Sequence, residues 1–351
     1  MEPDSTPAPK LFSPLSTLFP GYFSLVMATG IVSIAAHFME YTWISRALFC
    51  FNVIAYCVLW ALTLARVLFF TQQILADIMN NARSVLFLTM VAGTMVLGSQ
   101  FALMSPYMGV AKALWWLGIL LWVVLIYTFF TVNTVHEPKP KFEDAINGAW
   151  LLATVSTESI CVLGTLVAPS MRNAEAVFFV SLSAYLLGAM FYIVLIALIV
   201  YRWFFFSLPP DKLTPPYWIN MGALAITTLA GSRLLLSTTH WPFLETIRGF
   251  ITGFTLFFWV TGTWWIPLLI FVGIWRHVAQ RAPLKYDPQY WSLVFPIGMY
   301  TVSTFIFAQA TGLQVLASIP VAAFYVALAA WALTFAGMMH ALARQALHRE
   351  A

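Results

Sequence analysis

Tyr290-Trp-Ser-Leu-Val-Phe-Pro-Ile-Gly-Met-Tyr-Thr-Val-Ser-Thr304 is apolar enough to lie in a lipid bilayer, yet it carries a proline, a glycine and several hydroxyl side chains. Pro296 removes a backbone hydrogen bond and kinks a helix. In lipid, such a break is tolerated only where protein or a water-filled cavity covers it. We therefore expect a central membrane helix with Phe295 at its bend. The alternative is a kinked helix that only packs, because proline and glycine are common in membrane helices.

The whole chain has the composition of a polytopic membrane protein. Of its 351 residues, 61% are hydrophobic and 9% are charged, whereas soluble globular domains carry roughly 25% charged residues. The formal net charge of +4 is spread over short loops, so it does not indicate nucleic-acid binding. Cys50, Cys57 and Cys161 lie within apolar segments, match no metal site and predict no disulfide framework.

Ten segments are long and apolar enough to cross a bilayer, which takes about 20 residues each. They run near residues 18–38, 43–70, 83–104, 112–132, 146–167, 175–205, 217–237, 247–274, 290–310 and 319–343. The sequence thus predicts an all-α protein with a single transmembrane domain over residues 15–345.

The two ends of the chain are predicted to be cytoplasmic tails. Residues 1–14 are polar and proline-rich, which indicates a disordered tail, and residues 346–351 form a second, short tail. Of the 17 lysines and arginines, twelve fall on the side of the N-terminus and five on the opposite side. Because the positive side of a membrane protein faces the cytoplasm, we expect a multi-pass protein of the cell membrane with both termini inside.

Five of the spans read as weak repeats of one another, each starting with an aromatic residue. The repeats start at Phe23, Phe87, Trp150, Trp218 and Trp291, at intervals of 64, 63, 68 and 73 residues by subtraction. Each repeat would be one helical hairpin, and five hairpins give ten helices with pseudo-fivefold symmetry around a central pore. Chance similarity among apolar segments is the alternative.

In a ring of this kind, the residues four positions after each aromatic lie near one level. They are Met27, Val91, Thr154, Gly222 and Phe295, and we expect them to line the pore. Phe295 is the largest, so with Pro296 it is the candidate gate, because an aromatic side chain in a narrow pore acts as a hydrophobic constriction. Ordinary core packing is the alternative for a chain that contains 30 phenylalanines.

Glu158 and Arg233 are the charged residues that stand out inside the predicted spans. A carboxyl group in mid-membrane costs several kcal/mol unless it faces a lumen or a partner, so Glu158 is a candidate for coupling protons to an anion. Arg233 lies toward the outer end of its span, where it could attract an anion or pair with Glu158. The alternatives are a structural, hydrogen-bonded Glu158 and an Arg233 that extends to the interface.

No pattern indicates an enzyme, a cofactor or a metal site. The chain lacks paired histidine or cysteine ligands, a glycine-rich phosphate loop and a recognisable acyl-transfer triad. It also lacks the run of arginines that forms a voltage sensor.

Three segments resemble the tellurite-resistance/dicarboxylate transporter family. They are Phe19-Pro-Gly-Tyr-Phe-Ser-Leu-Val-Met-Ala-Thr-Gly-Ile-Val-Ser33, then Gly262-Thr-Trp-Trp-Ile-Pro-Leu-Leu269 with Trp275-Arg-His277, and Tyr286-Asp-Pro-Gln-Tyr-Trp-Ser-Leu-Val-Phe-Pro-Ile-Gly-Met-Tyr300. This family includes bacterial tellurite-resistance proteins, fungal malate and sulfite transporters and plant guard-cell slow anion channels. The resemblance implies ten helices as five hairpins around a pore, usually in a homotrimer. It also implies a pore-blocking phenylalanine beside a proline, which falls on Phe295 and Pro296.

The function that follows from the resemblance is transport of small anions across the lipid bilayer, with a C4-dicarboxylate such as malate as the expected substrate. Hydroxyl groups and helix dipoles would solvate the anion, Phe295 would gate the pore and Glu158 would couple protons. An acid at Glu158 departs from the uncharged pore that the channel branch implies. The alternatives are a passive channel for chloride, nitrate or sulfite, a tellurite-resistance exporter, or a membrane receptor whose pocket never opens through.

Overall fold

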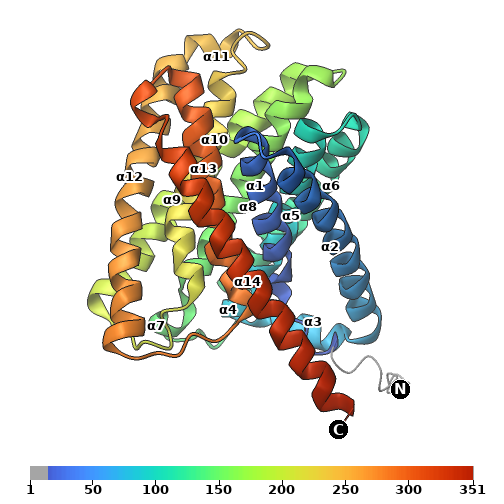
Figure 1. Cartoon of the computed structure of the whole chain (residues 1–351), viewed down its shortest axis with the longest axis vertical. Coiled ribbons are helices and arrows are strands. Elements are labelled where there is room, and N and C mark those ends of the chain that lie inside the picture. The colour runs from blue at the N-terminus through green and yellow to red at the C-terminus, as the bar shows by residue number, and fades with distance from the viewer. Residues whose placement is uncertain (1–14, 351) are drawn as a thin grey trace.

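The computed structural model describes residues 15–350, and over that range the chain forms helices and irregular connections without a strand (Figure 1). The predicted tail at residues 1–14 lies outside the described residues. At the other end, α14 (Ile319–Glu350) continues through residues that were assigned to a short tail. The all-helical membrane fold predicted from the sequence is therefore confirmed.

Five helices form an inner ring within the described part of the chain. Each contacts the next in chain order, and the last contacts the first, so the ring is closed. The ring helices are α1 (Phe23–Phe38), α5 (Leu88–Met104), α8 (Leu152–Val167), α10 (Ile219–Leu235) and α13 (Trp291–Thr311).

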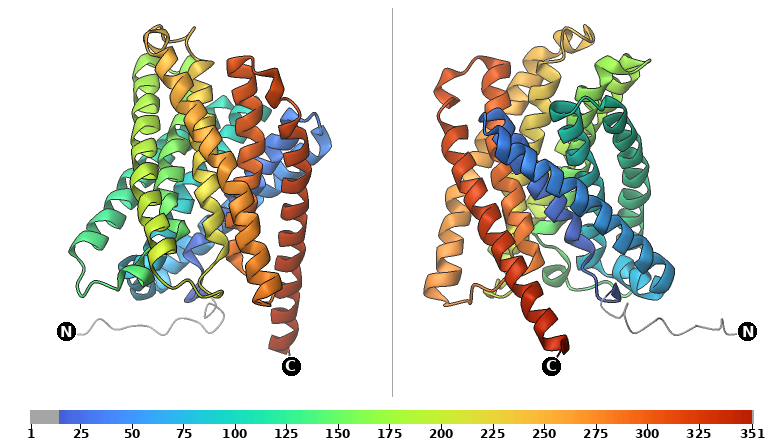
Figure 2. Two further views of the ribbon diagram at one scale, coloured as in Figure 1. Left: turned by 90° about the vertical axis from the view of Figure 1, so that its left-hand side faces the viewer. Right: turned by 45° about the vertical axis from the view of Figure 1, so that its right-hand side comes forward.

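Five further helices surround the ring, and each packs against the ring helix that precedes it. They are α2 (Thr42–Phe69), α6 (Met108–Val135), α9 (Ala174–Phe205), α12 (Arg248–Ile274) and α14. Figure 2 shows these long helices running roughly along the same axis as the ring. The chain between residues 15 and 350 is thus arranged as five helical hairpins.

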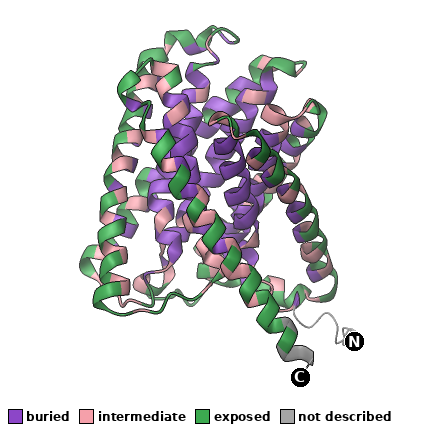
Figure 3. Cartoon of the chain, viewed as in Figure 1, coloured by how far each residue is buried: buried purple, intermediate pink, exposed green. Residues whose placement is uncertain are grey.

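Burial separates the two sets of helices. In the span Gly148–Ser170, which contains α8, 94% of the residues in the most apolar 18-residue stretch are buried. In the corresponding stretch of α2, 22% are buried. Figure 3 shows the same contrast, with buried residues at the centre and exposed ones on the outer helices. Large apolar side chains such as Trp116 and Phe204 are exposed there. A surface of this kind is expected to face lipid.

Within residues 15–350, nine helices are long and apolar enough to cross a membrane by themselves. The remaining ring helix is α10, which has 17 residues and follows the 3-10 turn η6 (Pro215–Trp218). It lies among α8, α9, α12 and α13. Because neighbouring helices cover it, α10 can carry Asn220, Thr227, Thr228 and Arg233 without exposing them to lipid.

Every ring helix starts with a short 3-10 turn at the lower end of the bundle in Figure 1. The turns are η2 (Pro20–Tyr22), η3 (Val85–Phe87), η4 (Gly148–Leu151), η6 and η8 (Pro288–Tyr290). They contact one another in the same order as the helices and close a second ring. The aromatic residue that opens each predicted repeat lies in its turn or directly after it, so the repeats correspond to equivalent positions.

Gly148 shows how closely two of these turns pack. A Cβ atom added to Gly148 would lie 2.5 Å from the Pro216 carbonyl oxygen, which is closer than real Cβ contacts allow. Only glycine lets η4 approach η6 at this distance.

Short elements complete both ends of the bundle. At the lower end, α3 (Thr71–Met79), α4 (Asn81–Ser84) and α7 (Phe142–Ala145) lie near the starts of the ring helices, whereas α11 (Phe243–Thr246) lies at the upper end (Figure 1). The segments η5 (Ala168–Ser170) and η9 (Gln314–Leu316) join helices, and η7 (Trp275–Ala279) adds a π-helical turn to α12.

Candidate functional site

A cavity lies toward the upper end of the ring, with about 470 Å³ of empty space that includes its opening. All five ring helices contribute to its wall, which places it on the axis of the ring. The wall is formed by Ile31, Ile34 and Phe38; Met95, Val96, Ser99 and Leu103; Ser159, Val162 and Leu166; Ile226, Leu229 and Arg233; and Met299, Val302 and Ile306.

The wall of this upper cavity is apolar except for two serines and one arginine. Ser99 Oγ donates a hydrogen bond to the Met95 carbonyl oxygen at 2.9 Å, and Ser159 Oγ donates to that of Ser156 at 2.7 Å. Both hydroxyl protons are therefore committed to the helices that carry them. Arg233 is left as the cationic group of the wall.

Arg233 occupies the last turn of α10 and is half-buried. None of the four ion pairs found within residues 15–350 involves it, and its Nε atom is buried without a hydrogen-bond partner. A cation without a counter-ion at the mouth of an apolar cavity attracts anions electrostatically.

Phe295 lies one helical turn below the cavity. It precedes Met299 by four residues, so the two side chains share a face of α13, and Phe295 is 1% exposed. By the same spacing, Met27 lies below Ile31 on α1 and Gly222 lies below Ile226 on α10. These three residues of the predicted level are thus on the cavity side of their helices.

On α5, the predicted Val91 also lies on the cavity side, because it precedes the wall residue Met95 by four residues. On α8, Val155 rather than the predicted Thr154 lies four residues before a wall residue, Ser159. Thr154 is fully buried one position away, and its hydroxyl has no hydrogen-bond partner in the described chain.

Gly222 and Pro296 belong to one contact between α10 and α13. A Cβ atom added to Gly222 would lie 2.6 Å from Pro296 Cγ, so the missing side chain makes room for the proline ring. The part of α13 around Pro296 is therefore packed against α10, directly beside Phe295.

Glu158 is not among the residues that line the upper cavity. A Cβ atom added to Gly188 of α9 would lie 2.6 Å from Glu158 Oε1, and Thr227 of α10 is next to the carboxyl group. Neither carboxyl oxygen has a hydrogen-bond partner among the described residues. The side chain thus lies between α8, α9 and α10, and it forms no ion pair with Arg233.

A second cavity lies at the lower end, under the starting turns of the ring helices, and its empty space of about 920 Å³ includes open solvent. Each ring helix contributes a residue from its starting turn or just before it: Phe19, Leu86, Asn147, Tyr217 and Gln289. This lower vestibule also contains charged side chains: Arg83, Glu143, Asp144, Arg202, Asp211 and Lys212. Sequence reasoning missed the vestibule, because loop residues carry no periodic signal.

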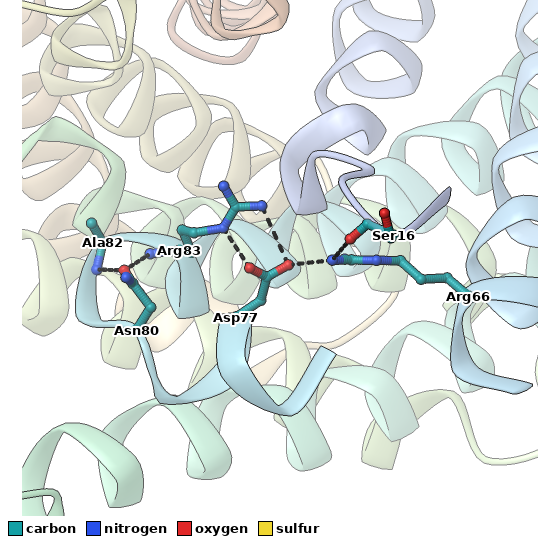
Figure 4. Close-up of polar contacts among 6 residues, drawn as sticks. All are labelled: Ser16, Arg66, Asp77, Asn80, Ala82 and Arg83. Carbon is teal, nitrogen blue, oxygen red and sulfur yellow. Dashed lines mark hydrogen bonds and ion pairs between the residues drawn. The ribbon is translucent and has the colours of Figure 1, made fainter. Parts of the chain in front are cut away.

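An ion-pair cluster ties the lower end together (Figure 4). Asp77 of α3 accepts hydrogen bonds from Arg66 Nη2 at 2.7 Å and from Arg83 Nε at 2.5 Å. Arg66 Nη2 also donates to the Ser16 carbonyl oxygen at 3.1 Å, and Asn80 accepts from the backbone N–H groups of Ala82 and Arg83. In the sequence, Arg66 and Arg83 indicated only which side of the membrane is positive.

Comparison with known proteins identifies relatives over most of the chain. An uncharacterized transporter of Methanocaldococcus jannaschii is 24% identical over 301 residues, which cover 84% of this chain and 86% of the relative. A sulfite efflux pump of Arthroderma benhamiae is 25% identical over 318 residues, covering 83% and 81%. An uncharacterized membrane protein of Mycobacterium tuberculosis is 41% identical over 152 residues, covering 43% and 77%.

Residues 17–339 match the family described as voltage-dependent anion channels. The match covers all five hairpins, and together with the relatives it confirms the resemblance found in the sequence. These are multi-pass membrane transporters and channels rather than enzymes. The chain belongs to the voltage-dependent anion channel family.

Proposed function

We propose that this protein conducts a small anion through the axis of its helix ring, from the lower vestibule past Phe295 to the upper cavity. The observation that carries the proposal is a cavity walled by all five ring helices with the unpaired Arg233 at its mouth. A ring of helices supplies a path that lipid cannot enter, and the cation raises the local concentration of anions.

Phe295 is the proposed gate of this path. It is nearly fully buried, it lies between the two cavities along α13, and the contact of Pro296 with Gly222 fixes the backbone beside it. An aromatic side chain at a constriction of this kind keeps the path free of water and ions until it moves.

A small oxyanion with a single acidic centre, such as sulfite, is the substrate class that we propose. The upper cavity offers one cation, two serine hydroxyls that donate to their own helices, and an otherwise apolar wall. The second carboxylate of malate or succinate would therefore lie among apolar side chains without a donor, which is costly. Relatives named sulfite efflux pumps cover most of the chain, which favours the same choice.

We propose passive conduction rather than proton-coupled transport. No residue of the upper cavity wall is acidic, and the Glu158 carboxyl packs against the outer helix α9 at Gly188. Protonation of Glu158 would therefore reach the anion only through a movement of α8 or α10.

Flux into liposomes tests this proposal. Purified protein is reconstituted, and malate, succinate, sulfite, chloride and tellurite are offered in the same assay. We expect sulfite to move down its gradient faster than malate, without a requirement for a proton gradient. Faster malate flux would support a dicarboxylate transporter, uphill uptake driven by protons would support a carrier, and no flux of any anion would support a receptor.

We also propose that the protein forms a homotrimer in the cell membrane, with the lower end of the bundle in the cytoplasm. The exposed apolar side chains of the outer helices would be shared between lipid and neighbouring subunits. Mass measurement in detergent should give three chains for each particle, and a tag on α14 should be digested only from the cytoplasmic face. A single chain, or digestion from outside, would contradict the respective proposal.

A further inference from the structure

Two of the three cations of the lower vestibule are paired with carboxylates. Arg83 is paired with Asp77, and Lys212 is paired with Asp144. The hydrogen bond and charge of Lys212 hold the pKa of the Asp144 carboxyl below its ordinary value, with smaller effects of Lys141 and Arg202. Arg202 is the vestibule cation that has no acidic partner within residues 15–350.

Arg202 is also the most deeply buried of these cations, with 2% of its surface exposed. Its Nε atom donates to the Glu143 carbonyl oxygen at 2.9 Å, which is a backbone group and carries no charge. Its Nη1 atom is buried and has no hydrogen-bond partner in the described chain. Leaving a charged donor buried and unpaired is expensive, so such a group calls for a partner that the protein itself does not supply.

Tyr217 presents a second unpaired donor to the same vestibule. It lies in the starting turn of α10, is 2% exposed, and its hydroxyl makes no hydrogen bond among the described residues. It is close enough to Arg202 for the two groups to interact electrostatically. Arg202 of α9 and Tyr217 of η6 therefore both line the lower vestibule, and each carries a buried donor that lacks a partner among the described residues.

Arg66 occupies the position in α2 that Arg202 occupies in α9, and its contacts are structural. Arg66 and Arg202 each lie three residues before the end of an outer helix, and the backbone carbonyl of each accepts the N–H that follows the helix. Arg66, which is 3% exposed, is neutralised by Asp77 at 2.7 Å. Arg202 lacks such a carboxylate, so the need for an anion remains unmet there.

We propose that Arg202 and Tyr217 form an anion-binding site in the lower vestibule, separate from Arg233 at the upper mouth. Its ligand is a small oxyanion with at least two oxygens on one centre, such as sulfite or a carboxylate. A guanidinium group and a hydroxyl group can donate to separate oxygens of one oxyanion, whereas a halide must accept both hydrogen bonds on a single atom. Glu143 and Asp211, which also line the vestibule, repel anions more strongly the higher the charge of the anion.

Calorimetric titration of purified Arg233→Gln protein with sodium sulfite isolates this site, because that variant lacks the upper cation. The choice of sulfite rests on the proposed function, whereas binding is measured without transport. We expect saturable sulfite binding that weakens at least fivefold on adding Tyr217→Phe and is lost on adding Arg202→Gln. Chloride titrated at the same ionic strength should bind at least fivefold more weakly than sulfite.

Lys141→Gln is the matched control, because Lys141 is an exposed cation of the same end that does not line the vestibule. It should leave sulfite binding unchanged.

Tyr217→Phe removes a hydroxyl group that makes no hydrogen bond, so its thermal melt should match that of the parent and keep the test valid even if Arg202→Gln folds poorly. The proposal would be overturned if Tyr217→Phe left the sulfite affinity unchanged, or if chloride bound as tightly as sulfite. Intact binding without liposome flux would instead overturn the proposed transport function and leave this site standing.

Discussion

The upper cavity and the lower vestibule lie at opposite ends of the same five helices, but they are built from different parts of them. The sides of the ring helices form the upper cavity, so its wall has the apolar composition of a membrane core around one unpaired arginine. Turns and loops form the lower vestibule, so it is rich in charges of both signs, half of which form ion pairs. We infer that the vestibule collects anions, whereas the upper cavity and the Phe295 level decide which of them pass.

Asp77→Ala is expected to have the largest effect, because it removes the counter-ion of a buried arginine at the lower end. The Arg66 side chain is 4% exposed, and breaking such a pair typically costs about 3–5 kcal/mol. A thermal melt in detergent should therefore shift strongly downward. Asp144→Ala is the control, since the side chains of Asp144 and Lys212 are 48% and 46% exposed and an exposed pair contributes about 0–1 kcal/mol. Equal melts of the two variants would show that the Asp77 cluster does not hold the lower end.

Arg233→Gln is expected to have an intermediate effect at the opposite end. Removing the cation of the upper cavity should raise the sulfite concentration for half-maximal flux about tenfold, which corresponds to about 1.4 kcal/mol. The melt should change little, because Arg233 forms no ion pair that the substitution would break.

Arg248→Gln is the matched control for Arg233, because Arg248 is a cation of the upper end whose side chain is 50% exposed and pairs with Glu245. It should leave the concentration dependence of flux as in the parent. If Arg248→Gln raised the sulfite concentration for half-maximal flux as much as Arg233→Gln, the effect of Arg233 would come from the net surface charge and not from its place in the cavity wall.

Glu158→Gln should have the smallest effect. Glutamine keeps the size of the side chain that packs against Gly188 but cannot titrate. Glu158 lies off the cavity wall, so replacing its carboxyl group by an amide should not alter a contact with the anion. We therefore expect anion flux to stay within roughly twofold of the parent at every pH tested. A pH dependence present in the parent and abolished in the variant would instead assign proton coupling to Glu158.

The ring and its hairpins could be predicted from the sequence, because a repeated aromatic marks the start of every ring helix, with glycine or proline in the starting turn of four of the five. The same repeats predict the level of Phe295. On α8, the predicted Thr154 falls one position from Val155, which precedes the wall residue Ser159 by four residues, because Trp150 lies two residues before the regular helix whereas the aromatics of the other repeats lie closer to theirs. Glu158 could not be assigned to a face, since a helix buried on all sides has no polar stripe to orient it.

From the sequence, the lysines and arginines of the lower end could be used only as a count, to predict which side of the membrane is cytoplasmic. Arg66, Arg83 and Arg202 contributed equally to the positive-inside count, yet two of them share Asp77 and the third has no acidic partner in the described chain. Which arginine meets a carboxylate depends on how α3 and α7 pack at the lower end of the bundle, and no local pattern in the sequence specifies that contact.

Sulfite flux through Phe295→Ala, compared with Phe307→Ala, tests the central claim most directly. Both phenylalanines are buried on α13, but Phe295 shares a face with the cavity residue Met299, whereas Phe307 stacks on Trp259 of the outer helix α12 with ring centroids 6.4 Å apart. If Phe295 closes the path, Phe295→Ala should raise flux about tenfold or more, equivalent to lowering the barrier by about 1.4 kcal/mol, and Phe307→Ala should not. Well-folded Phe295→Ala protein that conducts no faster than Phe307→Ala would contradict a gated path along the ring axis.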